Sequence, residues 1–290
     1  MEKQIKKIYK KASRDLYRQF KQYLEEANAH VERLETHIKA LKAIGQDTQR
    51  EEELLRLRKK EVTLQSVRYE EMVEGLTRNL ANVNQTAVEY VTGELPEIYT
   101  WNFNQKPYAG VDQIRFDIVD ENVIKRRILD GDIKLPKKKI YIPKDMRWNT
   151  RQLNSSVLQG ILNGESMTDI AKRILPITNR NEVSALRNAR TMVTGAENQG
   201  RVDRFDDLES KGVILNKVWI ATSDGRVREW HASMDGQEVG IHDSFVDGNG
   251  NELEYPGDPS APGETVYNCR CSMKSHIIGF RKEDGRIEYV

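Results

Sequence analysis

The chain has 290 residues, of which 38% are hydrophobic, 7% aromatic and 31% charged, and its net charge is +1. Residues 1–20 are charged throughout and lack the apolar core of a secretory signal. No apolar run approaches the roughly 20 residues that cross a bilayer, so we expect a soluble intracellular protein without a membrane anchor. The lean apolar content is typical of long exposed helices rather than one compact globule.

Charge is distributed unevenly along the chain. Residues 1–60 carry 16 Lys/Arg against 10 Asp/Glu, and residues 125–147 carry 9 against 3. Residues 203–265, by contrast, carry 5 Lys/Arg against 14 Asp/Glu. Such asymmetry indicates that different parts of the molecule face different partners.

Residues 1–93 have the pattern of two long helices separated by a break at Gly45. Neither helix buries its apolar stripe alone, so the pattern predicts an antiparallel hairpin arm, with a coiled coil between subunits as the alternative. The first stripe consists of Leu24, Ala27, Val31, Leu34, Ile38 and Leu41, and the second of Tyr69, Met72, Leu76, Leu80, Val83 and Ala87.

Residues 94–150 are predicted to form a connector. Residues 94–112 contain two prolines and several aromatic residues, which is typical of an irregular segment. A helix is expected over 113–130, followed by a small exposed β ribbon over 132–145. The ribbon carries four lysines that could contact the phosphates of double-stranded DNA, or that simply protect a strand edge from pairing. These lysines are Lys134, Lys137, Lys138 and Lys139.

Residues 151–290 are predicted to form a third region, in which helices precede a small β unit. The helices are expected over 150–163, 166–175 and 180–210, with the last ending at Gly212. Asp-Gly turn signals then separate short β-type runs. The predicted fold class is therefore α+β: a long N-terminal helical hairpin and a helical middle, then a small antiparallel β module packed on a long helix.

Both cysteines of the chain lie one residue apart, as Cys269 and Cys271. In an extended segment they point to the same side, whereas a disulfide across one residue would be strained. His231 and His242 occur in the same β unit, and these four side chains could hold a structural zinc ion. The alternative is two packed thiols and no cofactor.

Catalytic or calcium chemistry is less well supported by the sequence. His231 and Asp235 lie four residues apart, but Asp235-Gly236 has the pattern of a turn, and no nucleophile or paired glutamates accompany them. The run DGNGNE over 247–252 resembles the start of a calcium loop, but Glu252 stands where the turn glycine belongs. We expect a hairpin turn there, and no enzyme active site.

A set of residues in the C-terminal half occurs in a fixed order. It comprises Arg187, Arg190, Thr191, Thr194, Asn198, Trp219, Asp224, Arg226, Arg228, His231, Asp235, Gly236, Asn268, Cys269, Arg270 and Cys271. In this order the residues resemble the phage Mu protein F-like head morphogenesis family over about residues 155–280. The most specific part pairs the stretch from Asp224 to His231 with the later Asn-Cys-Arg-Cys. One departure is Ala261 before Pro262-Gly263, where relatives often have two prolines.

The resemblance implies a structural minor capsid protein of a tailed phage. It would be associated with the portal protein inside the procapsid, having reached it from the host cytoplasm, and would aid head assembly and DNA packaging or ejection. Scaffold, major capsid protein and DNA are further partners that it suggests. The alternatives are a DNA-binding coiled-coil adaptor, or a nuclease or toxin-like enzyme fused to the same module.

Overall fold

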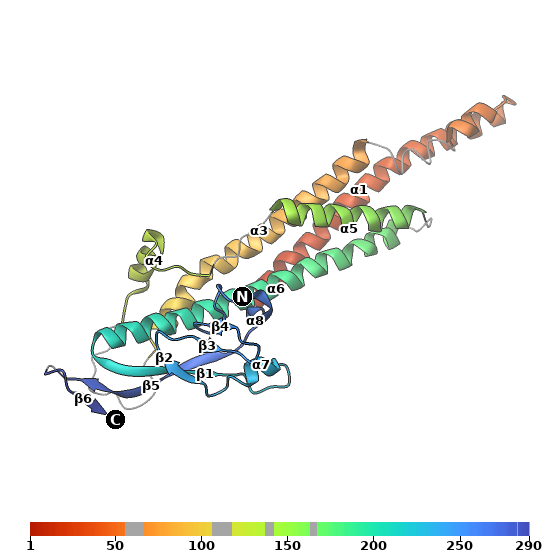
Figure 1. Cartoon of the computed structure of the whole chain (residues 1–290). Coiled ribbons are helices and arrows are strands. Elements are labelled where there is room, and N and C mark those ends of the chain that lie inside the picture. The colour runs from red at the N-terminus through yellow and green to blue at the C-terminus, as the bar shows by residue number, and fades with distance from the viewer. Residues whose placement is uncertain (56–66, 106–117, 137–141, 163–166, 283, 290) are drawn as a thin grey trace. The chain divides into compact units, whose positions relative to one another are not determined.

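The structure is a computed structural model that describes residues 1–55, 67–105, 118–136, 142–162, 167–282 and 284–289. By its internal contacts it divides into two units (Figure 1). Unit one comprises residues 1–87 and 139–185, and unit two comprises residues 88–138 and 186–290. Helices α3 and α6 contribute to both units.

The helices are α1 (Glu2–Ala43), α3 (Val67–Phe103), α4 (Glu121–Asp130), α5 (Ile142–Leu162), α6 (Met167–Ser210), α7 (Glu229–Ala232) and α8 (Gly263–Val266). The strands are β1 (Val213–Ile220), β2 (Glu238–Gly240), β3 (Phe245–Val246), β4 (Glu252–Leu253), β5 (Ser272–Arg281) and β6 (Ile287–Tyr289). None of the helices in the described residues is both long and apolar enough to cross a membrane.

The described residues of unit one form helices and short connections, with no strand among them. Its core brings together α1, the first part of α3, α5 and the first part of α6, which run alongside one another (Figure 1). Each helix contributes an apolar face at helical spacing, because residues three or four apart lie on the same side. The core side chains are Leu16, Val73, Leu76, Leu80, Leu153, Ile174 and Ile177.

The predicted antiparallel pairing of the first two long helices is confirmed, but its register differs. Tyr9 contacts Asn84 and Gln19 contacts Asn79, so the two helices run in opposite directions. Gly45 has a positive φ of 75°, which suits its place directly after α1. The part of α1 that faces α3 thus begins nearer the N-terminus than the predicted stripe, with Ile5, Tyr9, Ala12 and Leu16 buried.

A chain of polar side chains crosses this apolar unit and touches all four of its helices. The Tyr9 hydroxyl donates to Asn84 Oδ1 at 2.5 Å, and Asn84 Nδ2 donates to Asn181 Oδ1 at 2.9 Å. Asn181 Nδ2 donates in turn to Asn149 Oδ1 at 3.1 Å. Because each amide needs a matching partner when buried, this polar chain fixes the register of α1, α3, α6 and α5.

The prediction of an irregular segment over residues 94–112 is wrong for its first part, because α3 continues to Phe103, and residues 106–112 lie outside the described residues. The Thr100 hydroxyl donates to the carbonyl of Pro96 at 2.7 Å inside the uninterrupted helix. The apolar stripe continues through the proline at four-residue steps, with Leu95, Tyr99 and Phe103 buried. Burial of that stripe outweighs the loss of one helical hydrogen bond at the proline.

The next predicted elements also need correction. The helix expected over 113–130 begins at Glu121, where Asp120 accepts a hydrogen bond from the Asn122 N–H as its N-cap, and it ends at Gly131 with φ of 88°. The basic β ribbon is wrong where it is described: residues 132–136 form no strand and 142–145 begin α5. Alternation around a proline was too short a signal to distinguish a strand from a helix start.

The two helices predicted on either side of Pro176 are one helix, α6. Ile174 and Ile177 flank the proline and are both buried in the core of unit one, which holds the helix together across it. The predicted end of the helix is confirmed, since α6 stops at Ser210 and Gly212 has φ of 87°.

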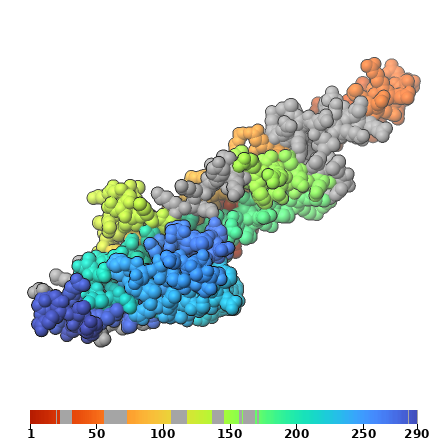
Figure 2. Space-filling view, in the orientation of Figure 1, coloured from red at the N-terminus to blue at the C-terminus, as the bar shows by residue number. Residues whose placement is uncertain are grey.

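The α+β class is confirmed by the sheet of unit two. Its strand order is β2-β1-β5-β6, each pair is antiparallel, and β3 and β4 form a separate two-stranded ribbon. The turn over 247–250 closes that ribbon, as expected. The sheet packs on the end of α6, where Phe205 and Leu208 join Trp219, Phe245 and other residues of the core. In the space-filling view these C-terminal residues form one rounded body, coloured blue (Figure 2).

Candidate functional site

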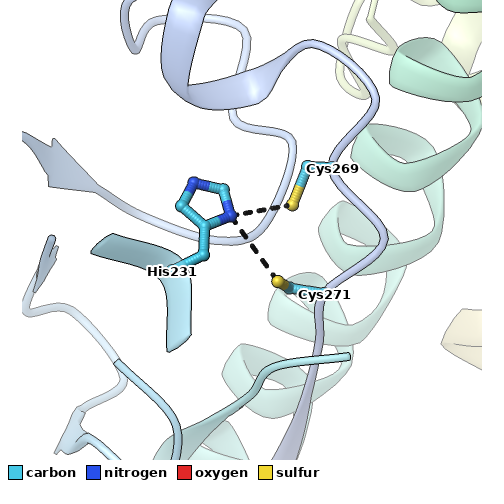
Figure 3. A group of neighbouring side chains, drawn as sticks. All are labelled: His231, Cys269 and Cys271. Carbon is cyan, nitrogen blue, oxygen red and sulfur yellow. Dashed lines mark hydrogen bonds between the residues drawn. The ribbon is translucent and has the colours of Figure 1, made fainter. Parts of the chain in front are cut away.

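His231, Cys269 and Cys271 come together in the interior of unit two. His231 Nδ1 lies 3.6 Å from the sulfur of each cysteine (Figure 3). Potential ligand atoms of the three residues all lie within 4.8 Å of one another. All three side chains are buried, with exposures of 1%, 2% and 4%. Three of the four predicted metal ligands therefore converge.

Local structure places these three side chains. His231 is in α7, and its ring meets the edge of the Trp219 ring with centroids 5.8 Å apart. The cysteines precede β5 in an extended segment, so their sulfurs face the same side, as expected. Asn268, with φ of 55°, turns the chain into this segment. Asn tolerates this left-handed conformation better than most residues.

A row of polar residues on α6 holds the segment from 268 to 271. Thr191 Oγ1 accepts from the Asn268 N–H at 3.2 Å, and Thr194 Oγ1 donates to the Cys269 carbonyl at 2.8 Å. Asn198 Nδ2 lies 3.1 Å from the Pro256 carbonyl and 3.4 Å from that of Cys271. The three helix residues are spaced by three and four, so they share one face of α6. This face satisfies backbone groups that the irregular segment leaves unpaired.

Two arginines, one within this segment and one in the stretch from Asp224 to His231, link the two parts of the chain. Arg270 forms a two-pronged ion pair with Asp224, of which the Nη2–Oδ1 contact is 2.7 Å. The paired guanidinium holds the pKa of the Asp224 carboxyl well below its usual range. Arg228 donates to the Tyr267 carbonyl. The stretch from Asp224 to His231 is thereby fastened to the Asn-Cys-Arg-Cys segment.

The other pattern residues also have structural contacts. The Arg187 guanidinium lies 4.9 Å from the centre of the Tyr267 ring. Asp235 accepts from the Ala221 N–H at 2.8 Å, and Gly236 has φ of 77° in the following turn. Arg226 is exposed beside Asp224, and Arg190 is exposed on α6.

The two thiols are electrostatically unequal. A hydrogen bond from the Cys269 thiol lowers the pKa of Cys271, and the His231 ring lowers it further. The same hydrogen bond, together with burial, raises the pKa of Cys269. Cys271 is thus the sulfur that more readily carries negative charge, as a metal ligand requires.

His242, the predicted fourth ligand, does not join this group. Its side chain is 70% exposed, and its Nε2 lies 2.9 Å from Glu209 Oε2. That carboxylate raises the pKa of His242. His242 lies in the turn after β2, and its nearness in sequence to the other ligands does not predict whether its side chain is buried.

Of the four predicted DNA-contacting lysines, Lys134 is exposed. The other three lie outside the described residues. Sequence reasoning missed a buried lysine, Lys217, whose Nζ donates to the Glu254 carbonyl at 2.8 Å and lies 5.2 Å from the Phe245 ring centre. Burial lowers the pKa of Lys217. The sequence does contain an indication of this burial, because Lys217 lies within the apolar run that forms β1.

Comparison with known proteins adds a family and two relatives. A family model described as Phage Mu protein F like protein matches residues 151–274. NAD(+)--arginine ADP-ribosyltransferase EFV of Enterococcus faecalis is 27% identical over 133 residues, covering 46% of this chain and 27% of that protein. Minor head protein GP7 of Bacillus phage SPP1 is 23% identical over 220 residues, covering 73% of this chain and 69% of that protein. No solved structure matches the chain significantly.

Proposed function

We propose that this protein is a minor head protein that assists head assembly in a tailed phage, because residues 151–274 match the family model described as Phage Mu protein F like protein. The observation that carries the proposal is the extent of the similarity to the minor head protein of phage SPP1. That similarity spans 220 residues, more than the family segment contains, so part of the helical remainder is shared as well.

The geometry of unit two supports a structural role. The pattern residues contact one another and the backbone: Asn198, Thr194 and Thr191 hold one side of the segment from 268 to 271, and Asp224 holds Arg270. Side chains with such internal contacts stabilise the fold, and their role does not depend on which partner the surface of the module binds. The proposal thus assigns the family pattern to construction of the module.

We also propose that the chain has no transferase activity. The similarity to the ADP-ribosyltransferase covers only 27% of that protein, which leaves most of it unmatched. The test is incubation of the full chain with labelled NAD⁺ and an arginine-containing acceptor. We expect neither labelled acceptor nor released nicotinamide, and either product above that of a boiled control would contradict this part of the proposal.

The proposed partner is the portal protein, and the proposed location is the interior of the capsid. Co-expression with the portal protein of the same phage should give a complex that survives size-exclusion chromatography, and mass spectrometry should detect the chain in purified procapsids. The matched control is co-expression of the chain with the major capsid protein in place of the portal protein. Absence of the chain from both procapsids and virions would overturn the assignment to the head.

Contact with packaged DNA through Lys134, Lys137, Lys138 and Lys139 is a narrower proposal, supported by the density of positive charge there. Binding by phosphate contacts falls steeply as salt rises. Replacing all four lysines with alanine should weaken binding to a DNA duplex. The control replaces four exposed lysines of α1 instead, Lys3, Lys6, Lys7 and Lys10, with the same change in net charge. Equal affinity of the two variants would remove the proposal.

A further inference from the structure

We propose that His231 Nδ1, Cys269 Sγ and Cys271 Sγ bind one zinc ion, with a water molecule as the fourth ligand. The three donors come from two segments that are 38 residues apart in the chain, α7 and the segment before β5. The donor set, one imidazole and two thiolates, is one that zinc prefers. The proposal goes beyond the head-protein function and does not depend on it.

The distances fit a tetrahedral ion. Zinc lies about 2.3 Å from a thiolate and about 2.0–2.1 Å from an imidazole nitrogen, which places the nitrogen and sulfur of a tetrahedral site about 3.5–3.6 Å apart. The two observed nitrogen–sulfur distances are both 3.6 Å. The nitrogen–sulfur distances therefore match those of a site that holds the ion, and the three ligand atoms all lie within 4.8 Å of one another (Figure 3).

Hydrogen bonding alone accounts less well for this arrangement. Whether it donates or accepts, Nδ1 forms one hydrogen bond along its ring plane, yet it lies equally close to two sulfurs, which are weak partners. Nε2 is buried and has no hydrogen-bond partner among the described residues. The ring is thus oriented by the sulfurs and by the edge of Trp219, not by a strong polar contact at its far nitrogen.

Charge balance also favours the ion. A zinc ion with two thiolates and a neutral imidazole has no net charge, so the group can be buried without a large desolvation penalty. Metal at this position would tie α7 to the segment before β5, so its binding would be coupled to the folding of this module.

The experiment measures metal in the full chain, purified without chelators and freed of any histidine tag. We expect about one zinc per chain after gel filtration, as binding coupled to folding predicts. Replacement by cobalt(II) should give the visible bands of a tetrahedral thiolate site. Cys271→Ser and His231→Gln should lose the metal, while His242→Gln and His276→Gln, which alter exposed histidines paired with Glu209 and Glu238, should retain it.

A second measurement uses the wild-type chain, so it tests the proposal even if the variants fail to fold. Iodoacetamide should label neither cysteine of the native wild-type chain, and both after a zinc-specific chelator is added, with a lower Tm. Three results would overturn the proposal: zinc well below one per chain with no uptake of added zinc or cobalt, a disulfide between Cys269 and Cys271 in protein made in a reducing cytosol, or full zinc retention in the double variant His231→Gln/Cys271→Ser.

Discussion

Unit one and unit two differ in how their buried backbone N–H and C=O groups are hydrogen-bonded. In unit one the helices pair their own N–H and C=O groups, and the core consists mainly of aliphatic side chains. In unit two much of the chain is irregular. The buried Arg, Lys, His and Asp side chains of the described residues all lie there: Arg204, Lys217, His231, Asp247 and Asp258.

Several of these buried polar groups hold loops in place. Asp247 accepts from the N–H groups of Asn249 and Asn251, and Asp258 accepts from those of Glu254 and Ser260. Irregular backbone must find such partners, because an unpaired buried N–H or C=O is costly. The difference teaches that unit one depends on periodic apolar burial, whereas unit two depends on particular side chains at particular positions.

Loss of the central aromatic of unit two should have the largest effect. Trp219 is fully buried against Phe245, with ring centroids 5.2 Å apart. Trp219→Ala should lower the free energy of unfolding by about 3–5 kcal/mol. Hydrogen exchange should accelerate first in β1 and β5, while Ile220→Ala, at a side chain 39% exposed, should change little. Equal acceleration throughout α1 would show that the two units are not energetically distinct.

The corresponding change in unit one is Leu80→Ala. This side chain is fully buried in the helical core. Its truncation should cost about 2–5 kcal/mol, measured by urea denaturation, and should accelerate exchange in α1 and α5 more than in the sheet. Val183→Ala is the control, because Val183 is 66% exposed on α6. A faster-exchanging sheet with an unchanged α1 would contradict the comparison.

Two asparagines on α6 sharpen the comparison further. Asn198 in unit two donates to three backbone carbonyls, whereas Asn181 in unit one bonds chiefly to the side chains of its polar chain. Asn198→Ala should cost about 1–3 kcal/mol, because it leaves buried carbonyls without a donor. Asn181→Ala should cost less, since Asn84 and Asn181 are only partly buried and water can replace part of the lost hydrogen bonding. Thermal denaturation of both variants measures the two losses of stability. A larger loss for Asn181→Ala than for Asn198→Ala would contradict the proposed difference between the units.

The smallest effect concerns pH. Glu209 raises the pKa of His242 in the folded state, so the pair stabilises the protein fully below the unfolded pKa of about 6.5 and loses its effect as pH rises through the folded pKa. His242→Gln should therefore lower Tm slightly near pH 6 and not at about pH 9. High salt should abolish the difference, because the pair is exposed. An NMR titration should show the pKa of His242 falling in Glu209→Gln.

Periodicity allowed much of unit one to be predicted from the sequence. It predicts the burial of Leu76 and Leu80 correctly, but tertiary packing overrides the breaks that it predicts at Pro96 and Pro176. The predicted stripe of α1 misses Tyr9 and its neighbours, because their burial comes from tertiary contact with α3. Local patterns do not contain that information.

The prediction of the candidate site rests on local geometry and on the clustering of residue types, and not on periodicity. Cys269 and Cys271 were placed on one side by local geometry, and His231 was selected because histidines cluster in the β unit. His242 was wrong for the same reason, since only the fold separates a buried histidine in α7 from an exposed one after β2. The fastening role of Thr191, Thr194 and Asn198 required the three-dimensional contact between α6 and a segment more than 70 residues later.

The polar chain of unit one also has a consequence for the timing of synthesis. Tyr9 and Asn84 are 75 residues apart, and Asn84 and Asn181 are 97 apart. At roughly 5–20 residues per second, a ribosome needs roughly 5–20 s to progress from Asn84 to Asn181. During that interval α1 and α3 exist as a pair whose remaining apolar faces have no covering helix. The nascent chain therefore passes through a period of exposed hydrophobic surface that ends only when α5 and α6 emerge.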